Sequence, residues 1–248
     1  MALGDVLQSF STPADFARGM TFDGADLWVV DLDGTIYRVD PSDGSTLQSF
    51  SAPGSGHRGM AWDGTALWHA TDQTSPRTIY RLNPANGSVL DSFDSPDTLP
   101  RGITFDGTDL WLAGSTNNTI YRLNPSNGSV LDSFDTPSTL PAGMAWDGES
   151  LWIVDNGQNT IYRLDPADGT ILDSFSTPGS NGSGLTFDGT DLWHCDLSAN
   201  TIYRIEWAGL FLMQVRVGGQ WIDAVPHVRV GGQWVDAVPH RRVGGQWV

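Results

Sequence analysis

Five copies of the tetrapeptide Thr-Ile-Tyr-Arg contain all 5 tyrosines of the chain, at intervals of 43, 41, 41 and 41 residues. The tyrosines are Tyr37, Tyr80, Tyr121, Tyr162 and Tyr203. A period near 40 residues with four strand-like runs in each copy is typical of a β-propeller blade. The repeat therefore limits the chain to an array of similar β units.

One repeat shows four short runs rich in aromatic and β-branched residues, which predict four strands at 19–24, 26–30, 35–39 and 45–50. The segments between them contain Asp-Gly and Asp-Pro pairs, which favour tight turns because Pro fixes φ and Gly accepts positive φ. The hydrophobic residues show no helical period. The predicted class is all-β.

Each repeat carries a large aromatic residue at three of its four strand positions. The first position holds Phe22, Trp62, Phe105, Trp146 and Phe187. The second holds Trp28, Trp68, Trp111, Trp152 and Trp193. The third holds Phe10, Phe50, Phe93, Phe134 and Phe175. We expect all three to form the core between neighbouring sheets, which pack about 10 Å apart.

The number of blades follows from the fourth strand, which occurs only four times after residue 18, whereas the other three strands occur five times. Val6–Phe10 matches Val89–Phe93 and precedes the first complete repeat. We therefore predict a five-bladed β-propeller over residues 1–206, in which this N-terminal strand completes the last blade beside Thr201–Ile205. Such a strand also removes the open edges of the ring.

Acidic residues dominate the charge of the chain, which has 29 Asp and Glu against 13 Arg, no Lys, and a net charge of −16. Residues 1–205 carry 26 acids and 9 Arg, or −17, and residues 206–248 carry 3 acids and 4 Arg, or +1. We expect no binding to nucleic acid and no insertion into a membrane. The composition favours a protein built for high salt, and a GC-rich genome that encodes Arg in place of Lys is the alternative.

The start of the chain has neither the basic region nor the apolar run of a signal peptide. We expect a protein made in the cytoplasm that remains there or leaves by another route, such as the assembly of a virion. The chain has a single cysteine, Cys195, which excludes an internal disulfide and predicts a buried structural thiol.

The C-terminal region, 207–248, contains a second repeat, because Val-Gly-Gly-Gln-Trp recurs every 13 residues. Each copy predicts a small hairpin around its Gly-Gly pair, and one such hairpin is not stable alone in water. We expect Trp221, Trp234 and Trp247 to attach this region to another protein or to other copies of the chain, giving a homo-oligomer. A low-complexity tail is the alternative.

Two resemblances follow from these motifs. The blade text, with GLTFDGTDLW and TIYRLDPADGTILDSF, resembles the repeats of glutaminyl cyclotransferase-like and NHL-like or lyase-like propellers over residues 6–205. The tail resembles the VRVGGxWV repeats of tail-associated structural proteins of tailed viruses, over residues 215–248. With the acidic, Lys-free composition, this resemblance implies a virion protein from a virus of a halophilic archaeon, with other virion proteins as partners.

We expect no enzymatic activity and no cofactor. The only Glu residues, Glu149 and Glu206, lie in a turn and at the end of the propeller, and most Asp residues lie in turns, where they bond to their own backbone. No nucleophile elbow, zinc helix or phosphate loop is present. The alternatives are a propeller enzyme of lyase or cyclotransferase type and a multivalent glycan-binding propeller.

Two sets of equivalent residues are candidates for a binding site at one rim. Before the first strand of each blade the sequence has Arg18, Arg58, Arg101, Ala142 and Ser183. At the end of the second strand it has Asp31, Thr71, Gly114, Asp155 and Asp196. Three Arg opposite three Asp could hold an anionic sugar, such as a host surface glycan, or a carboxylate or a cation. We favour mutual ion pairing.

Two further sets of polar residues are expected to be structural. His69 and His194 follow the second-strand tryptophans where the other blades have aliphatic residues, so we expect them at half-buried core positions and expect no metal site. The arginines of the Thr-Ile-Tyr-Arg motifs are expected to pair with neighbouring Asp residues on the outer strands. They are Arg38, Arg81, Arg122, Arg163 and Arg204.

Overall fold

The computed structural model describes residues 3–73 and 75–207, and the backbone of six strands between Met213 and Trp247. The chain divides into two compact units, and the larger one spans Leu3–Glu206. In the described residues every regular element is a strand, as predicted from the repeat. None of them forms a helix long and apolar enough to cross a membrane.

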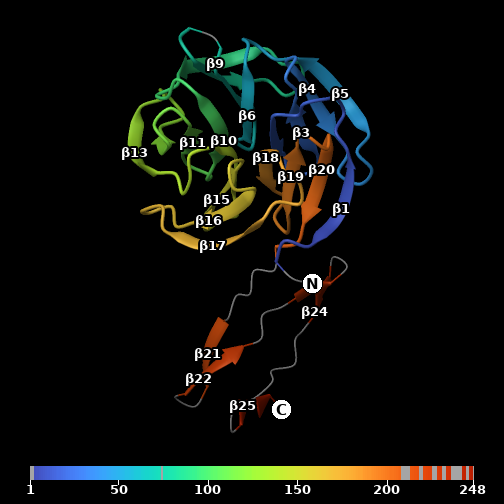
Figure 1. The fold of residues 1–248 in the computed structure, drawn as a ribbon, viewed down its shortest axis with the longest axis vertical. Coiled ribbons are helices and arrows are strands. Elements are labelled where there is room, and N and C mark those ends of the chain that lie inside the picture. Colours follow the sequence, from blue (N-terminus) through green and yellow to red (C-terminus); the bar gives the residue numbers. More distant parts are fainter. Residues whose placement is uncertain are drawn as a thin grey trace. The chain divides into compact units, whose positions relative to one another are not determined.

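The larger unit consists of five antiparallel sheets of four strands each, arranged as the blades of a propeller (Figure 1). Blade 1 comprises β2 (Gly19–Phe22), β3 (Leu27–Val30), β4 (Thr35–Val39) and β5 (Thr46–Ser51). Blade 2 comprises β6 (His57–Trp62), β7 (Leu67–Thr71), β8 (Thr78–Leu82) and β9 (Val89–Asp94). Blade 3 comprises β10 (Pro100–Phe105), β11 (Leu110–Gly114), β12 (Thr119–Leu123) and β13 (Val130–Asp135). Blade 4 comprises β14 (Pro141–Trp146), β15 (Leu151–Asp155), β16 (Thr160–Leu164) and β17 (Ile171–Ser176).

Blade 5 joins the two ends of the propeller sequence. It comprises β18 (Gly182–Phe187), β19 (Leu192–Asp196), β20 (Thr201–Ile205) and the N-terminal strand β1 (Val6–Ser11). β1 pairs antiparallel with β20, with Phe10 opposite Ile202, and the Phe10 ring lies 5.9 Å from that of Trp193. This confirms the predicted closure, because Phe10 takes the place that Phe50 has beside Trp28 in blade 1.

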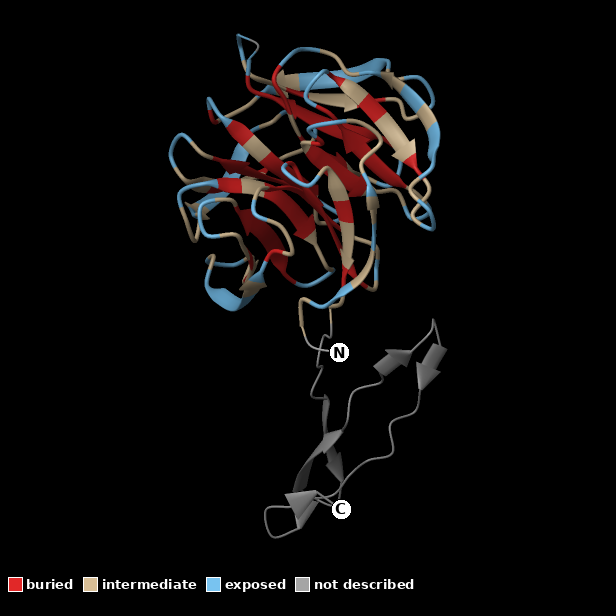
Figure 2. Ribbon diagram, turned by 45° about the vertical axis from the view of Figure 1, so that its right-hand side comes forward, coloured by how far each residue is buried: buried red, intermediate tan, exposed pale blue. Residues whose placement is uncertain are grey.

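The core lies on the inner and middle strands, whereas the outer strands and turns are largely exposed (Figure 2). All five tryptophans of the second strands are at most 2% exposed, as predicted. The aromatic residues at the other two positions are less buried than predicted, since Phe22, Phe50 and their equivalents are only partly buried. Those rings pack against the edges of the core clusters.

A recurring contact links Asp, Trp and Arg within each blade, and we call it the framework unit. In blade 1 the Trp28 Nε1 donates to Asp23 Oδ2 at 2.8 Å, while Asp23 Oδ1 accepts two backbone N–H bonds of its own turn. The Arg38 guanidinium lies 5.7 Å from the centre of the Trp28 ring and 2.7 Å from Asp26. The unit thus ties a turn, a second strand and a third strand together.

The framework unit occurs in the other four blades, with Arg81, Arg122, Arg163 and Arg204 over the equivalent tryptophans. Each of these arginines forms an ion pair with an Asp of its own blade. The prediction that the arginines of the Thr-Ile-Tyr-Arg motifs pair with Asp is confirmed, but their partners lie in the turn between the first and second strands and not on the outer strands.

The C-terminal unit contains three two-stranded antiparallel sheets, which confirms the predicted hairpins. Their strands are β21 (Met213–Val217) with β22 (Gln220–Ala224), β23 (Val228–Val230) with β24 (Gln233–Val235), and β25 (Arg242–Val243) with β26 (Gln246–Trp247). The side chains of Trp221, Trp234 and Trp247 lie outside the described residues, so their role in attachment stays a prediction.

Candidate functional site

The inner strands approach one another backbone to backbone around the axis of the propeller. Each has a glycine at the same position, and a Cβ built on Gly19 would lie only 2.1 Å from the carbonyl oxygen of Arg58 in the next blade. The residue before each glycine therefore stands close to its counterparts from the other blades. Arg18, Arg58 and Arg101 all occupy this position, in blades 1, 2 and 3.

A cavity of about 160 Å³ lies at this end of the inner strands, and we call it the arginine pocket. Its lining comprises Arg18, Arg58, Arg101, Ser115, Leu140, Pro141, Ala142, Asn156, Ser183 and Leu197. The pairing of the inner strands is irregular between His57 and Met60 and between Pro100 and Ile103, the segments that contain Arg58 and Arg101. Such bulges re-aim side chains next to functional sites.

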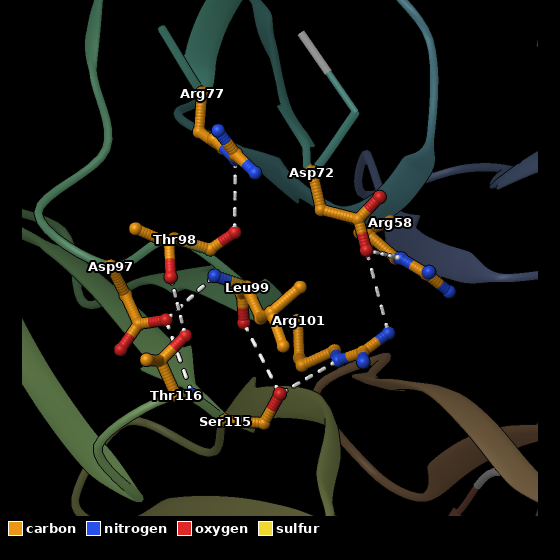
Figure 3. Close-up of polar contacts among 9 residues, drawn as sticks. All are labelled: Arg58, Asp72, Arg77, Asp97, Thr98, Leu99, Arg101, Ser115 and Thr116. Carbon is orange, nitrogen blue, oxygen red and sulfur yellow. Dashed lines mark hydrogen bonds and ion pairs between the residues drawn. The ribbon is translucent and has the colours of Figure 1, made fainter. Parts of the chain in front are cut away.

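A single carboxylate, that of Asp72, pairs with two of the three arginines (Figure 3). Its Oδ2 lies 2.6 Å from Arg58 Nε and 3.6 Å from Arg101 Nη1, and Arg101 Nε also donates to Ser115 Oγ at 3.0 Å. Sequence reasoning missed Asp72. A usable signal was the loop length, since 12 residues separate Trp68 from Tyr80, whereas 10 separate Trp111 from Tyr121.

The third arginine, Arg18, forms no ion pair with any residue that the structure describes. Its Nε atom is buried and lacks a hydrogen-bond partner among them. Burial, followed by repulsion from Arg58 and Arg101, lowers the pKa of Arg18 below its ordinary value. Three guanidinium groups and one carboxylate leave an excess of positive charge at the arginine pocket, although the protein as a whole is acidic.

The other side of the arginine pocket, from blades 4 and 5, is uncharged. Leu140, Pro141 and Leu197 provide apolar surface, and Asn156 Nδ2 donates to Asn181 Oδ1 at 3.1 Å. The Oδ1 atom of Asn156 is buried and has no hydrogen-bond partner in the described part of the chain. The pocket thus has a cationic half and a half that combines apolar contact with a neutral acceptor.

The structure does not bring the predicted aspartates together with the arginines. Asp31 accepts from the Thr35 amide at 2.8 Å, and the Tyr37 hydroxyl donates to it at 3.1 Å. Asp155 accepts from the backbone of Leu140 and Gln158, and Asp196 from that of Asn181, Ser198 and Ala199. The expected pairing of the two rings is therefore corrected, because rim-loop donors lie within reach of these carboxylates and bond to them instead.

Blade 3 has Gly114 at the end of its second strand in place of an Asp, and a carboxylate from another segment makes the equivalent hydrogen bond. A Cβ built on Gly114 would lie 2.3 Å from the carboxyl carbon of Asp97, so the Asp97 side chain fills that space. Asp97 Oδ1 accepts from the Leu99 amide at 2.7 Å, as Asp155 does from Leu140 (Figure 3). In blade 3 the carboxylate thus comes from the loop before the first strand, and it still accepts a backbone hydrogen bond at the rim.

Comparison with known proteins agrees with this architecture. A family model described as Outer membrane protein assembly factor BamB (PQQ_2) matches residues 63–201, more than half of the chain. The chain belongs to the PQQ_2 family. No curated protein sequence matches it significantly.

Several solved structures share the fold of this PQQ_2 chain. Glutaminyl cyclase of Myxococcus xanthus aligns with a TM-score of 0.70 at 11% identity, covering 82% of this chain and 95% of that one. A nidogen/laminin complex aligns with a TM-score of 0.54 at 20% identity, covering 79% and 78%. An inactive virginiamycin B lyase from Staphylococcus aureus with quinupristin gives 0.50 at 24% identity, covering 80% and 68%. At these identities the likeness shows the fold alone.

Buried histidines lie in two blades of this PQQ_2 propeller, beneath the rim. His69 and His194 are 0% exposed, so they lie in the core as predicted but are fully buried and not half-buried. Burial, together with the neighbouring His57, lowers the pKa of His69 to about 3, and burial lowers that of His194 to about 4. His57, which sequence reasoning missed, stacks on His69 with their Nδ1 and Nε2 atoms 3.0 Å apart.

The remaining titratable groups near the axis are structural. Cys195 is a free, buried cysteine, as predicted, and burial raises the pKa of its thiol to about 11. Across the described residues, no three His, Cys, Asp or Glu side chains are grouped so that they could hold a metal ion.

The arginine pocket of this PQQ_2 chain is suited to bind an anion. Guanidinium groups offer fixed N–H donors that match a carboxylate or phosphate, and they keep their charge at all ordinary pH values. The side chains that line the pocket are Arg, Ser, Asn and apolar residues. This lining can hold and orient a negatively charged group.

Proposed function

We propose that this chain is a non-enzymatic binding protein of a virus particle, whose propeller recognises a host-surface group and whose C-terminal repeats attach it to the particle. The observation that carries the proposal is the arginine pocket, where three blades contribute an Arg and the lining offers donors and apolar contact. General acid–base catalysis needs a group whose pKa is near the working pH. Recognition needs only the complementary surface.

The description of the family supports a role in holding other proteins, since it names an assembly factor. The C-terminal repeats support attachment, because each small hairpin needs another surface to cover it and each carries one tryptophan. We infer from their resemblance to tail-associated repeats that the particle is a tailed virus. The charge of +1 for residues 206–248 suits contact with acidic sister proteins.

The second candidate is a propeller enzyme of cyclotransferase or lyase type, and the observation in its favour is the overall likeness to glutaminyl cyclase. That likeness extends over 82% of the chain at 11% identity, so it supports a shared scaffold. The two candidates differ at the pocket. An enzyme requires a side chain that moves a proton or attacks the substrate.

Attachment is tested by imaging particles made with a chain truncated after Glu206, beside particles with the full chain. We expect the truncated propeller to fold but to be absent from the particles, because an aromatic anchor contributes about 2 kcal/mol or more when it is fully desolvated. Full-length chains in which Trp221, Trp234 and Trp247 are changed to Ala should behave like the truncation. Particles that carry the truncated propeller at full occupancy would reject the docking role of the repeats.

The proposed halophilic host is tested by melting the propeller in NaCl between roughly 0.1 and 2 M, over which the Debye length falls from about 10 Å to a few Å. With −17 on residues 1–205, screening should raise the melting temperature markedly. A flat curve would leave base composition as the reason for the missing Lys.

A further inference from the structure

We propose that the arginine pocket binds the carboxylate of a sugar acid, one molecule per chain, with its hydroxyl groups directed to the uncharged half of the pocket. This names the ligand class of the site in the proposed function and rests on that function only for its biological setting. The arguments below come from the two halves of the pocket.

The cationic half has an unused donor. Asp72 neutralises part of the charge of Arg58 and Arg101, but the buried Nε of Arg18 has no hydrogen-bond partner among the described residues. Arg18 lines the pocket and forms no ion pair with a described residue, so its guanidinium charge is left for an incoming carboxylate. The planar guanidinium also fits a carboxylate better than it fits a neutral hydroxyl. These atoms therefore favour a carboxylate over a neutral sugar.

The uncharged half has an unused acceptor. Asn156 Oδ1 is buried without a partner, and the amide of the same side chain is already bonded to Asn181. Asn156 and Ser183 line the pocket with neutral polar groups, which suit the hydroxyl groups that acetate and other simple carboxylates lack. Leu140, Pro141 and Leu197 add apolar surface for the C–H groups of a ring. The ligand should therefore carry a carboxylate and hydroxyl groups on one small frame.

The size of the cavity limits the ligand further. Its volume of about 160 Å³ is below the 300–1,000 Å³ typical of pockets for drug-sized molecules. The pocket suits a single ring, either free or at the end of a chain. It also predicts one site, because the five blades present Arg, Arg, Arg, Ala and Ser at the equivalent position. A lectin with one site per blade would have five similar residues there.

The test is a calorimetric titration of the full chain with glucuronate, glucose, acetate, sulfate and N-acetylglycine at roughly 0.1 M NaCl. We expect one glucuronate per chain, bound at least about tenfold more tightly than each of the other four ligands. Arg18→Gln should weaken glucuronate about tenfold or more. Asn156→Ala should weaken glucuronate while leaving acetate unchanged. The matched control is Arg38→Gln in the framework unit of the same blade, which should leave glucuronate binding unchanged.

Several results would overturn the proposal. They are no glucuronate binding by the folded chain, five sites per chain, equal binding of glucose or N-acetylglycine, and equal effects of Arg18→Gln and Arg38→Gln. Should Arg18→Gln fail to fold, Arg18→Lys supplies the same test, because it keeps the charge but loses the planar fork and should still weaken glucuronate. Truncated propellers that stay on the particles while glucuronate binding is intact would reject the proposed docking and leave this ligand assignment standing.

Discussion

The framework units and the arginine pocket use the same residue type in opposite ways. In the framework, every blade places an Arg over a Trp and beside an Asp, so that each positive charge meets a ring face and a carboxylate. In the arginine pocket, one buried Asp pairs with only two of the three arginines, and the other two blades have Ala142 and Ser183 instead. A contact made inside each blade must be repeated five times, whereas five blades share one axial pocket.

The difference also predicts opposite energetic roles. A framework Arg gains both from its ion pair and from the ring below it, and each is worth roughly 0.5–1 kcal/mol near a surface. An Arg of the arginine pocket is partly desolvated and is repelled by its neighbours, which lower the pKa of Arg18. We therefore expect framework residues to stabilise the fold and residues of the arginine pocket to bind ligand at little or no gain in stability.

Deleting residues 1–11 should have the largest effect of any change considered. β20 would lose β1, the outer of its two partner strands, and Trp193 its contact with Phe10, leaving an open edge in the ring. We expect aggregation, measured by size-exclusion chromatography and by thermal melting. A truncated chain as soluble and as stable as the full one would mean that a different segment closes blade 5.

Removing a framework ring should be the next largest effect. Trp111 is 2% exposed, packs on Phe134, and donates a hydrogen bond to Asp106. Trp111→Ala should lower the free energy of unfolding by about 3–5 kcal/mol, measured by urea denaturation. The control is Leu131→Ala on the outer strand of the same blade, whose side chain is half exposed and which should cost far less. Equal losses would contradict the placement of stability in the framework.

The pH range over which stability is lost should differ between the buried histidines and the framework carboxylates. The folded pKa of His194, about 4, lies below the ordinary 6.5, so the unfolded state binds its proton first as the pH falls. Stability from this group should be complete above pH 6.5 and should be lost as the pH falls from there toward 4, by about 2 kcal/mol at pH 5. Asp63, whose pKa is lowered to about 2, loses its contribution only below its ordinary 3.8.

His194→Ile, which copies Ile153 of blade 4, tests that assignment. The variant should reduce the dependence of the unfolding free energy on pH between 6.5 and 5 by about the 2 kcal/mol assigned to His194 and leave the part due to His69, with Asp63→Asn as the control that keeps the wild-type slope in this window. An unchanged slope in His194→Ile would show that this histidine titrates normally in the fold.

Sequence alone was sufficient for the fold, because the framework repeats with a fixed period and each copy contains its own turns and aromatic positions. Phe10 could be placed in the last blade for the same reason. The three arginines of the arginine pocket could also be placed, since each precedes a glycine that recurs in every blade. These are features that alignment of the repeats makes visible.

The partners of those arginines could not be predicted in the same way. Asp72 lies in a loop that is longer in blade 2, and Asp97 reaches the position of Gly114 from the preceding loop. Asn156 directly follows the second strand of its blade, where other blades have Asp72, Ser115 and Leu197, and the residue type at this position differs from blade to blade. Loop conformations decide which carboxylates bond to the backbone and which face the arginines, and an alignment of strands does not contain them.

The most direct test of the division between framework and arginine pocket is the free energy of unfolding of Arg18→Gln and Arg38→Gln, two changes of the same residue type in blade 1. Arg38 is 2.7 Å from Asp26 and lies over Trp28, whereas Arg18 has no ion pair among the described residues. We predict that Arg38→Gln lowers the unfolding free energy by about 1 kcal/mol. Arg18→Gln should leave it unchanged within about 0.5 kcal/mol or raise it. A larger loss in Arg18→Gln than in Arg38→Gln would contradict the account.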